Sequence, residues 1–163
     1  MRRTGLEFPP EPPMGGPLLP GVDRGVLVNP QRAVVAEDTR PVPVSADVLW
    51  DEIVNFLGLS NKAKDELGYL DPLAMYLLGV YGGLIDATGD TDTGTSTKIE
   101  LDNMLKGAKT RLLYANAGHP LHDANGFSNV SYYSGRIEAA LFAGGETQGA
   151  IPTEVPPVSK YLG

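Results

Sequence analysis

The sequence predicts a mainly α-helical protein: a small helical bundle with a minor β element, flanked by a long extended N-terminal arm and an extended C-terminal tail. Proline distribution is the first reason, because nine of the 14 prolines fall in residues 1–45 and three in the last 20 residues. Proline fixes φ and removes a backbone donor, so proline-rich stretches form few helices. The second reason is that apolar residues recur at helical spacing between these stretches. We therefore expect an arm over 1–45, a helical body over 46–143 and a tail over 144–163. Two β-branched pieces of the arm, residues 25–28 and 33–36, are the predicted β element.

Length and composition narrow the function classes. A chain of 163 residues is typical of one folded domain, and its 42% hydrophobic content is enough for a modest core. The net charge of −7 argues against a basic face for sequence-specific nucleic-acid binding. The absence of cysteine excludes disulfides and thiolate chemistry. No apolar run reaches the ~18 residues of a membrane-spanning helix, so we expect no membrane partner.

The predicted arm has the composition of a docking segment. All five of its basic residues are arginine, whose planar fork favours paired contacts with carboxylates at interfaces. The stretch FPPEPPMGGPLLPG, residues 8–21, adds apolar groups to a backbone that favours the polyproline II conformation. Proline removes part of the ordering entropy in advance, so we expect this stretch to bind other subunits as a preformed strap. The predicted partner-docking residues are Arg2, Arg3, Phe8, Met14, Leu18, Leu19, Arg24 and Arg32 of the arm and Tyr161 of the tail.

The body begins with two predicted helices. Ser45 is a suitable N-cap for a helix over 46–57, which Gly58 would end. Ser60 is a suitable N-cap for a shorter helix over 61–67.

The third predicted helix covers residues 72–86. Asp71 followed by Pro72 is a strong start signal, because aspartate caps the helix and proline fits its first position. The segment is apolar nearly all round, so we expect it to form the buried centre of the body. Each internal glycine costs about 1 kcal/mol relative to alanine, which indicates that another backbone packs closely there. These glycines are Gly79, Gly82 and Gly83.

A fourth helix follows a turn-rich loop. Thr97 and Glu100 form a possible capping box, and apolar residues recur at helical spacing from Leu101 to Ala115. Gly118, with a proline two residues later, ends this helix.

Residues 127–142 are ambiguous. The stretch VSYYSGRIEAALF fits either a hairpin or a strand followed by a short helix. Tyr132 and Tyr133 beside Arg136 could stack on a ligand, although aromatic residues are also usual in a half-buried strand.

Two groups of residues could hold a metal ion. His119, His122 and Asp123 offer two imidazoles and a carboxylate, as zinc sites do, but they lie in a helix-terminating loop without further ligands. The stretch DTDTGTSTKIE partly matches a calcium loop through Asp90 and Asp92, yet glycine stands where the third ligand belongs. We therefore expect neither a metal nor another cofactor.

The sequence contains none of the motifs of nucleophilic catalysis. It lacks a G-x-S-x-G elbow and a phosphate-binding glycine-rich loop followed by lysine. We therefore expect a non-enzymatic protein without catalytic residues.

The stretch DPLAMYLLGVYGGLI, followed by KIELDNMLKGAKTRLLYANAGHP, resembles the helical part of head–tail adaptor (connector) proteins of tailed bacteriophages. The matching residues are Leu73 to Ile85 and Leu101 to Asn116, and the two quoted stretches together cover about a quarter of the chain. The resemblance implies a virion protein, made in the host cytoplasm, that forms an oligomeric ring beneath the portal. Its partners would be portal, tail or capsid subunits and further copies of itself.

The long N-terminal arm departs from that family, whose extended segment is more often C-terminal. This departure leaves a capsid cement or decoration protein as an alternative, and an accessory subunit of a cellular complex would use its arm in the same way. An alternative of a different class is a small metal-dependent enzyme that uses His119, His122 and Asp123.

Overall fold

The residues described by the computed structural model are 40–89, 95–118, 127–147 and 149–162. The chain divides into two units, Met1–Asp38 and Thr39–Gly163, and every described residue belongs to the second. The predicted arm up to residue 39 lies outside the described residues, together with its docking residues from Arg2 to Arg32 and both β-like pieces.

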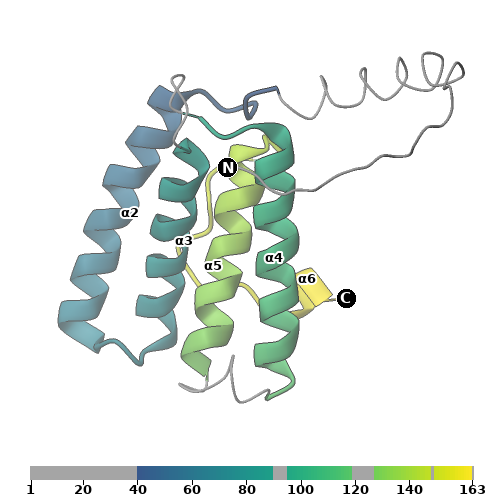
Figure 1. The fold of residues 1–163 in the computed structure, drawn as a ribbon. Coiled ribbons are helices and arrows are strands. Elements are labelled where there is room, and N and C mark those ends of the chain that lie inside the picture. Colours follow the sequence, from purple (N-terminus) through teal and green to yellow (C-terminus); the bar gives the residue numbers. More distant parts are fainter. Residues whose placement is uncertain (1–39, 90–94, 119–126, 148, 163) are drawn as a thin grey trace, which may run out of the picture. The chain divides into compact units, whose positions relative to one another are not determined.

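Five helices and no strand are present in the described ranges, so the prediction of a mainly α-helical bundle is confirmed. The helices are α2 (Ala46–Leu67), α3 (Pro72–Thr88), α4 (Lys98–Asn116), α5 (Phe127–Ala143) and α6 (Ser159–Leu162). The four long helices lie side by side in the order α2–α3–α5–α4 (Figure 1). The sole β interaction among the described residues is an isolated bridge between Pro41 and Thr97. α2 and α4 are therefore the edge helices of a row.

The first helix is longer than predicted. α2 starts after Ser45, whose hydroxyl accepts the Val48 N–H at 3.3 Å, as the sequence indicates. It then continues through Gly58 to Leu67, so the predicted break into two helices is wrong. The buried residues recur at helical spacing on both sides of Gly58, and burying them against α3 outweighs the roughly 1 kcal/mol that a helical glycine costs. They are Leu49, Ile53, Phe56, Ser60 and Ala63.

The central helix begins where the sequence predicts. The Asp71 carboxylate accepts the N–H of Leu73 at 2.9 Å and of Ala74 at 3.3 Å, and Pro72 occupies the first helical turn. α3 lies between α2 and α5, which agrees with the lack of a polar face in its sequence (Figure 1). Its buried residues are Ala74, Tyr76, Leu77, Gly79, Val80, Gly83, Leu84 and Ala87.

α3 and α5 touch backbone to backbone. A Cβ added to Gly79 would lie 2.1 Å from the carbonyl oxygen of Tyr132, and one added to Gly135 would lie 2.2 Å from that of Tyr76. Both distances are far inside van der Waals contact, so no larger residue fits without moving a helix. The predicted close approach of another backbone is confirmed at Gly79, whereas the nearest neighbour of Gly82 is an arginine side chain.

α4 is capped as its sequence predicts. The Thr97 hydroxyl accepts the Glu100 N–H at 3.2 Å, and the Glu100 carboxylate accepts the Thr97 N–H at 2.7 Å, which completes the capping box. The helix ends just before Gly118, whose φ of 78° suits glycine. Its buried residues are Leu101, Ala108, Leu112 and Ala115.

α5 corrects the prediction for residues 127–142, which was a hairpin or a strand followed by a short helix, because the whole stretch is one helix. Its valine and tyrosines favour strands locally, but its burial follows a helical pattern. Gly135 and Ala139, four residues apart, both face α3, where a Cβ on Gly83 would lie 2.6 Å from the Ala139 Cβ. Small residues at this spacing let two helices approach closely, and that tertiary contact outweighs the local preference.

The C-terminal segment is irregular until α6, as an extended tail would be, but it lies on the helical body of the same chain. Ile151 belongs to the main core cluster. The Tyr76 hydroxyl donates a hydrogen bond to the Pro152 carbonyl at 2.7 Å. Tyr161 and Leu162 of α6 pack against the smaller cluster between α4 and α5. The segment therefore covers part of the bundle.

Ser60→Ala tests the continuity of α2. The Ser60 hydroxyl is buried without a hydrogen-bond partner in the part of the chain that the structure describes. Alanine removes this unsatisfied group and has the higher helix propensity, so we expect the free energy of unfolding to rise by about 1 kcal/mol. Urea denaturation followed by circular dichroism measures it. If Ser60 instead capped a separate helix, the substitution would lower stability by about 1 kcal/mol.

Candidate functional site

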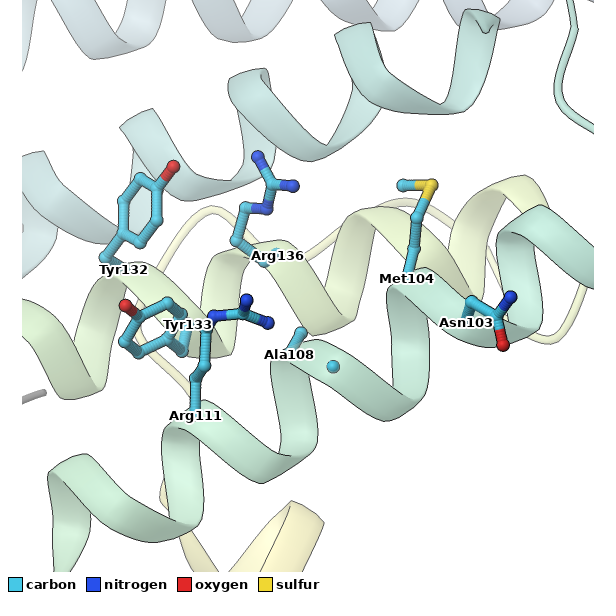
Figure 2. Close-up of a pocket in the computed structure, with 8 residues that line it drawn as sticks. Asn103, Met104, Ala108, Arg111, Tyr132, Tyr133 and Arg136 are labelled. Carbon is cyan, nitrogen blue, oxygen red and sulfur yellow. The ribbon is translucent and has the colours of Figure 1, made fainter. Parts of the chain in front are cut away.

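A pocket of about 340 Å³ opens between α4 and α5. Figure 2 shows side chains from the two helices on its two walls. The pocket is lined by Asn103, Met104, Gly107, Ala108 and Arg111 of α4 and by Tyr132, Tyr133 and Arg136 of α5.

The α5 wall is held in place by contacts to α3 and within the helix. Arg136 forms an ion pair with Asp86 of α3, and its guanidinium lies 6.0 Å from the centre of the Tyr132 ring. The rings of Tyr132 and Tyr133 meet edge to face, with centres 5.4 Å apart. Arg136 therefore already has a carboxylate partner, and both rings have defined orientations.

Arg111 supplies the other cation of the pocket. Among the residues that the structure describes, it takes part in no hydrogen bond or ion pair. Its guanidinium lies over Gly107, where an added Cβ would stand 3.0 Å from Nη1. Figure 2 shows Arg111 extending from α4 toward Tyr133. Glycine at position 107 thus leaves room for the guanidinium at the pocket wall.

The pocket has the chemistry of an acid-recognition site. Its polar side chains are two guanidinium groups, two phenols and an amide. Guanidinium groups stay charged and donate paired hydrogen bonds to carboxylates or phosphates. None of the described lining residues is a histidine, a carboxylate or an aliphatic hydroxyl. The arrangement suits binding of an anionic group.

The sequence indicates one wall of this pocket. Tyr132, Tyr133 and Arg136 are the side chains that it groups as able to stack on a ligand, and the structure brings all three together. In a strand, neighbouring tyrosines would point to opposite faces, whereas a helix turns by about 100° per residue and keeps both at the pocket. The sequence around Arg111 does not indicate a pocket residue, because it does not show which helix lies beside α4.

The two groups considered as possible metal ligands lie outside the described residues. They are His119, His122 and Asp123 in one loop and Asp90 and Asp92 in the other. In the described ranges, no group of three or more histidine or acidic residues could hold a metal ion. None of the helices in those ranges is long and apolar enough to cross a membrane.

Tyr161, the predicted docking residue of the tail, contacts its own chain. Glu138 of α5 is 1% exposed, and its carboxylate accepts a hydrogen bond from the Tyr161 hydroxyl. The same carboxylate pairs with Lys160 Nζ at 2.7 Å. These two contacts give the buried charge its partners and attach α6 to α5.

Two phenols near Glu138 are held in their neutral form. Burial raises the pKa of Tyr76 above its ordinary value, and the charge of Glu138 raises it further. Burial also raises the pKa of Tyr161, as do its hydrogen bond to Glu138 and the charge of that carboxylate. A raised folded-state pKa means that the protonated phenols stabilise the fold below the ordinary tyrosine pKa of about 10. This contribution is lost as pH rises above that value toward the folded-state pKa.

A second candidate surface is an exposed line of apolar residues on the edge helix α2. Trp50, Val54 and Leu57 are 52%, 67% and 39% exposed. Their spacing of i, i+4 and i+7 places them in one line along the helix, and we refer to them as the α2 outer stripe. Asp47 and Asp51, both exposed, lie beside this line. The stripe is thus an apolar surface with an acidic border.

Tyr161→Phe and Lys160→Gln separate the two contacts to Glu138. We expect Tyr161→Phe to lower the free energy of unfolding by about 1.5–3 kcal/mol, because it removes a hydrogen bond to a buried charge. Lys160 is 43% exposed, and glutamine keeps a hydrogen-bond donor for the buried carboxylate, so Lys160→Gln should cost less than Tyr161→Phe. Urea denaturation of both variants gives the comparison. A larger loss for Lys160→Gln would contradict the assignment of the tyrosine as the main partner.

Comparison with known proteins does not place the chain in a family. No family model, no curated protein and no solved structure matches it. The function is therefore inferred from the residues of the chain itself.

Proposed function

We propose that the protein is a non-enzymatic structural subunit of a large assembly. The assembly we favour is a tailed-bacteriophage virion, in which the chain acts as a head–tail adaptor that docks on the portal ring. The observation that carries the proposal is the α2 outer stripe, since it is an apolar line on an edge helix that packs mainly against α3 in the part of the chain that the structure describes.

The α2 outer stripe supports a docking role because its exposure is costly for a free subunit. Water covers more than half of Trp50 and two thirds of Val54. Single exposed apolar residues are common, but contiguous apolar surface on a soluble protein usually marks a contact with another molecule. The acidic border favours a partner whose apolar patch is surrounded by lysine or arginine.

The arm supports the same role from the sequence. Its five arginines and its apolar residues have the composition of an interface segment rather than of a solvated linker. The virion assignment has a separate basis, namely the resemblance of Leu73 to Ile85 and Leu101 to Asn116 to head–tail adaptors. The general docking role and the virion role can therefore fail separately.

Incorporation into particles tests the proposal. Virions are produced with the wild-type chain or with Val54→Glu in its place, and mass spectrometry measures the amount of this chain per purified particle. We expect Val54→Glu to reduce incorporation about tenfold or more, because a buried unpaired carboxylate costs several kcal/mol. Asn55→Glu is the matched control, since Asn55 is exposed on the same helix but lies off the stripe. It should be incorporated like the wild type, and both variants should keep their helical circular dichroism.

Removal of residues 2–38 tests the arm in the same particles. This deletion keeps Arg40, whose carbonyl accepts the Lys98 N–H at 2.6 Å, so the helical signal should remain nearly intact while incorporation is lost. Normal incorporation of the deletion variant would contradict the role of the arm.

Absence of the wild-type chain from virions would contradict the virion assignment, and cryo-electron microscopy that places the chain on the capsid surface would favour a cement protein.

A further inference from the structure

We propose that the pocket between α4 and α5 binds the proline-rich segment FPPEPPM, residues 8–14, of a second copy of this chain, with the Glu11 carboxylate on Arg111. The inference rests on the proposed function in one respect, which is that the arm binds other subunits. It adds the receiving site on the neighbouring subunit and the chemistry of recognition.

The charge of the pocket is the first argument. The chain carries a net charge of −7, yet the pocket has two arginines and no carboxylate among its lining residues. Asp86 pairs with Arg136, so Arg111 is the arginine of the pocket that has no carboxylate partner among the described residues. A guanidinium donates two parallel hydrogen bonds to the two oxygens of one carboxylate. The pocket therefore matches a ligand with a single acidic group.

The aromatic residues of the pocket are the second argument. Tyr132 and Tyr133 form an edge-to-face pair on α5, and Met104 lies on the α4 wall (Figure 2). Grooves lined by aromatic rings are the usual receptors for polyproline II segments. Such a segment is already extended before it binds, so it loses little conformational entropy on binding. The ligand class indicated by these side chains is a proline-rich peptide with one acid.

The chain itself contains such a peptide. Glu11 stands between two Pro-Pro pairs in FPPEPPM. A polyproline II helix has three residues per turn, so this sequence would place Phe8, Glu11 and Met14 along one edge. In the proposed complex the Glu11 carboxylate would contact Arg111. Phe8 and Met14, on either side of it, would contact the two tyrosines and Met104 of the pocket. A volume of about 340 Å³ is near the lower end of the usual range for small ligands, ~300–1,000 Å³, and suits a few side chains.

Peptide binding to the full-length protein is the test. A fluorescent peptide of residues 6–16 is titrated with the wild type, Arg111→Gln and Lys109→Gln, and anisotropy gives the dissociation constants. We expect Arg111→Gln to bind roughly ten- to hundredfold more weakly than the wild type, as loss of a charge-assisted contact predicts. Lys109 is the matched control, because it is an exposed cation of α4 outside the pocket lining, and Lys109→Gln should bind like the wild type.

A second peptide tests whether Glu11 is the residue that pairs with Arg111. The Glu11→Gln peptide should bind the wild type as weakly as the native peptide binds Arg111→Gln, with little further loss when both changes are combined. Full additivity of the two losses would overturn the pairing of Glu11 with Arg111. No binding by the wild type, or equal binding by Arg111→Gln, would overturn the site.

Inorganic phosphate distinguishes the peptide from a simple anion. We expect phosphate in tenfold excess over the protein to leave the peptide bound, because phosphate has no apolar surface that could contact the tyrosine rings. Complete displacement would show a general anion site and overturn the peptide assignment. The incorporation test changes Val54 and leaves Arg111 as it is. If Val54→Glu loses incorporation while the peptide fails to bind, this inference is overturned and the proposed function is not.

Discussion

The contact between the backbones of α3 and α5 is the constraint on which the rest of the structure depends. Gly79 and Gly135 each stand where a Cβ would lie about 2 Å from a carbonyl oxygen of the other helix. Glycine lowers the stability of an isolated helix, so its presence in both partners is compensated by the dispersion contacts of close packing. The approach of the two helices therefore depends on the absence of two side chains.

This contact places the α5 wall of the pocket. The carbonyl that Gly79 admits belongs to Tyr132, and Arg136 lies one turn further along, where it reaches Asp86 of α3. The residues on other sides of α5 have different tasks: Ile137 packs in the cluster with Leu112, and Glu138 receives α6. One helix thus connects the core, the candidate binding pocket and the C-terminal segment. The row of helices also leaves α2 at an edge, which accounts for the exposure of its outer stripe.

Local chemistry in the sequence predicted the starts of three helices. Ser45, the Asp71–Pro72 pair and the Thr97–Glu100 capping box each satisfy free N–H groups with side chains a few residues away, so neighbours in the sequence are sufficient. Burial was decisive where prediction failed. From the sequence alone, Gly58 predicts the end of a helix and the tyrosines of α5 favour a strand. Packing against α3 outweighs both local preferences, and the sequence does not show that packing.

The candidate site was only partly predictable for the same reason. Tyr132, Tyr133 and Arg136 are neighbours in the sequence and could be grouped, whereas Arg111 joins them only through the pairing of α4 with α5. The tail has a contact that its sequence does not indicate. Its prolines predict an extended segment, and the structure adds that Ile151 and Tyr161 contact the body of their own chain. Proline content predicts an extended backbone and does not show what that backbone covers.

The most direct test of the central role of the α3–α5 contact is the stability of Gly135→Ala beside that of Gly58→Ala. Both glycines are helical, but a Cβ at Gly58 meets no atom within 4 Å, whereas one at Gly135 meets the α3 backbone. Chemical denaturation should show that Gly58→Ala is more stable than the wild type by about 1 kcal/mol and that Gly135→Ala is less stable by about 3 kcal/mol or more. A Gly135→Ala protein as stable as the wild type would contradict the account, because α3 and α5 would then not meet at that glycine.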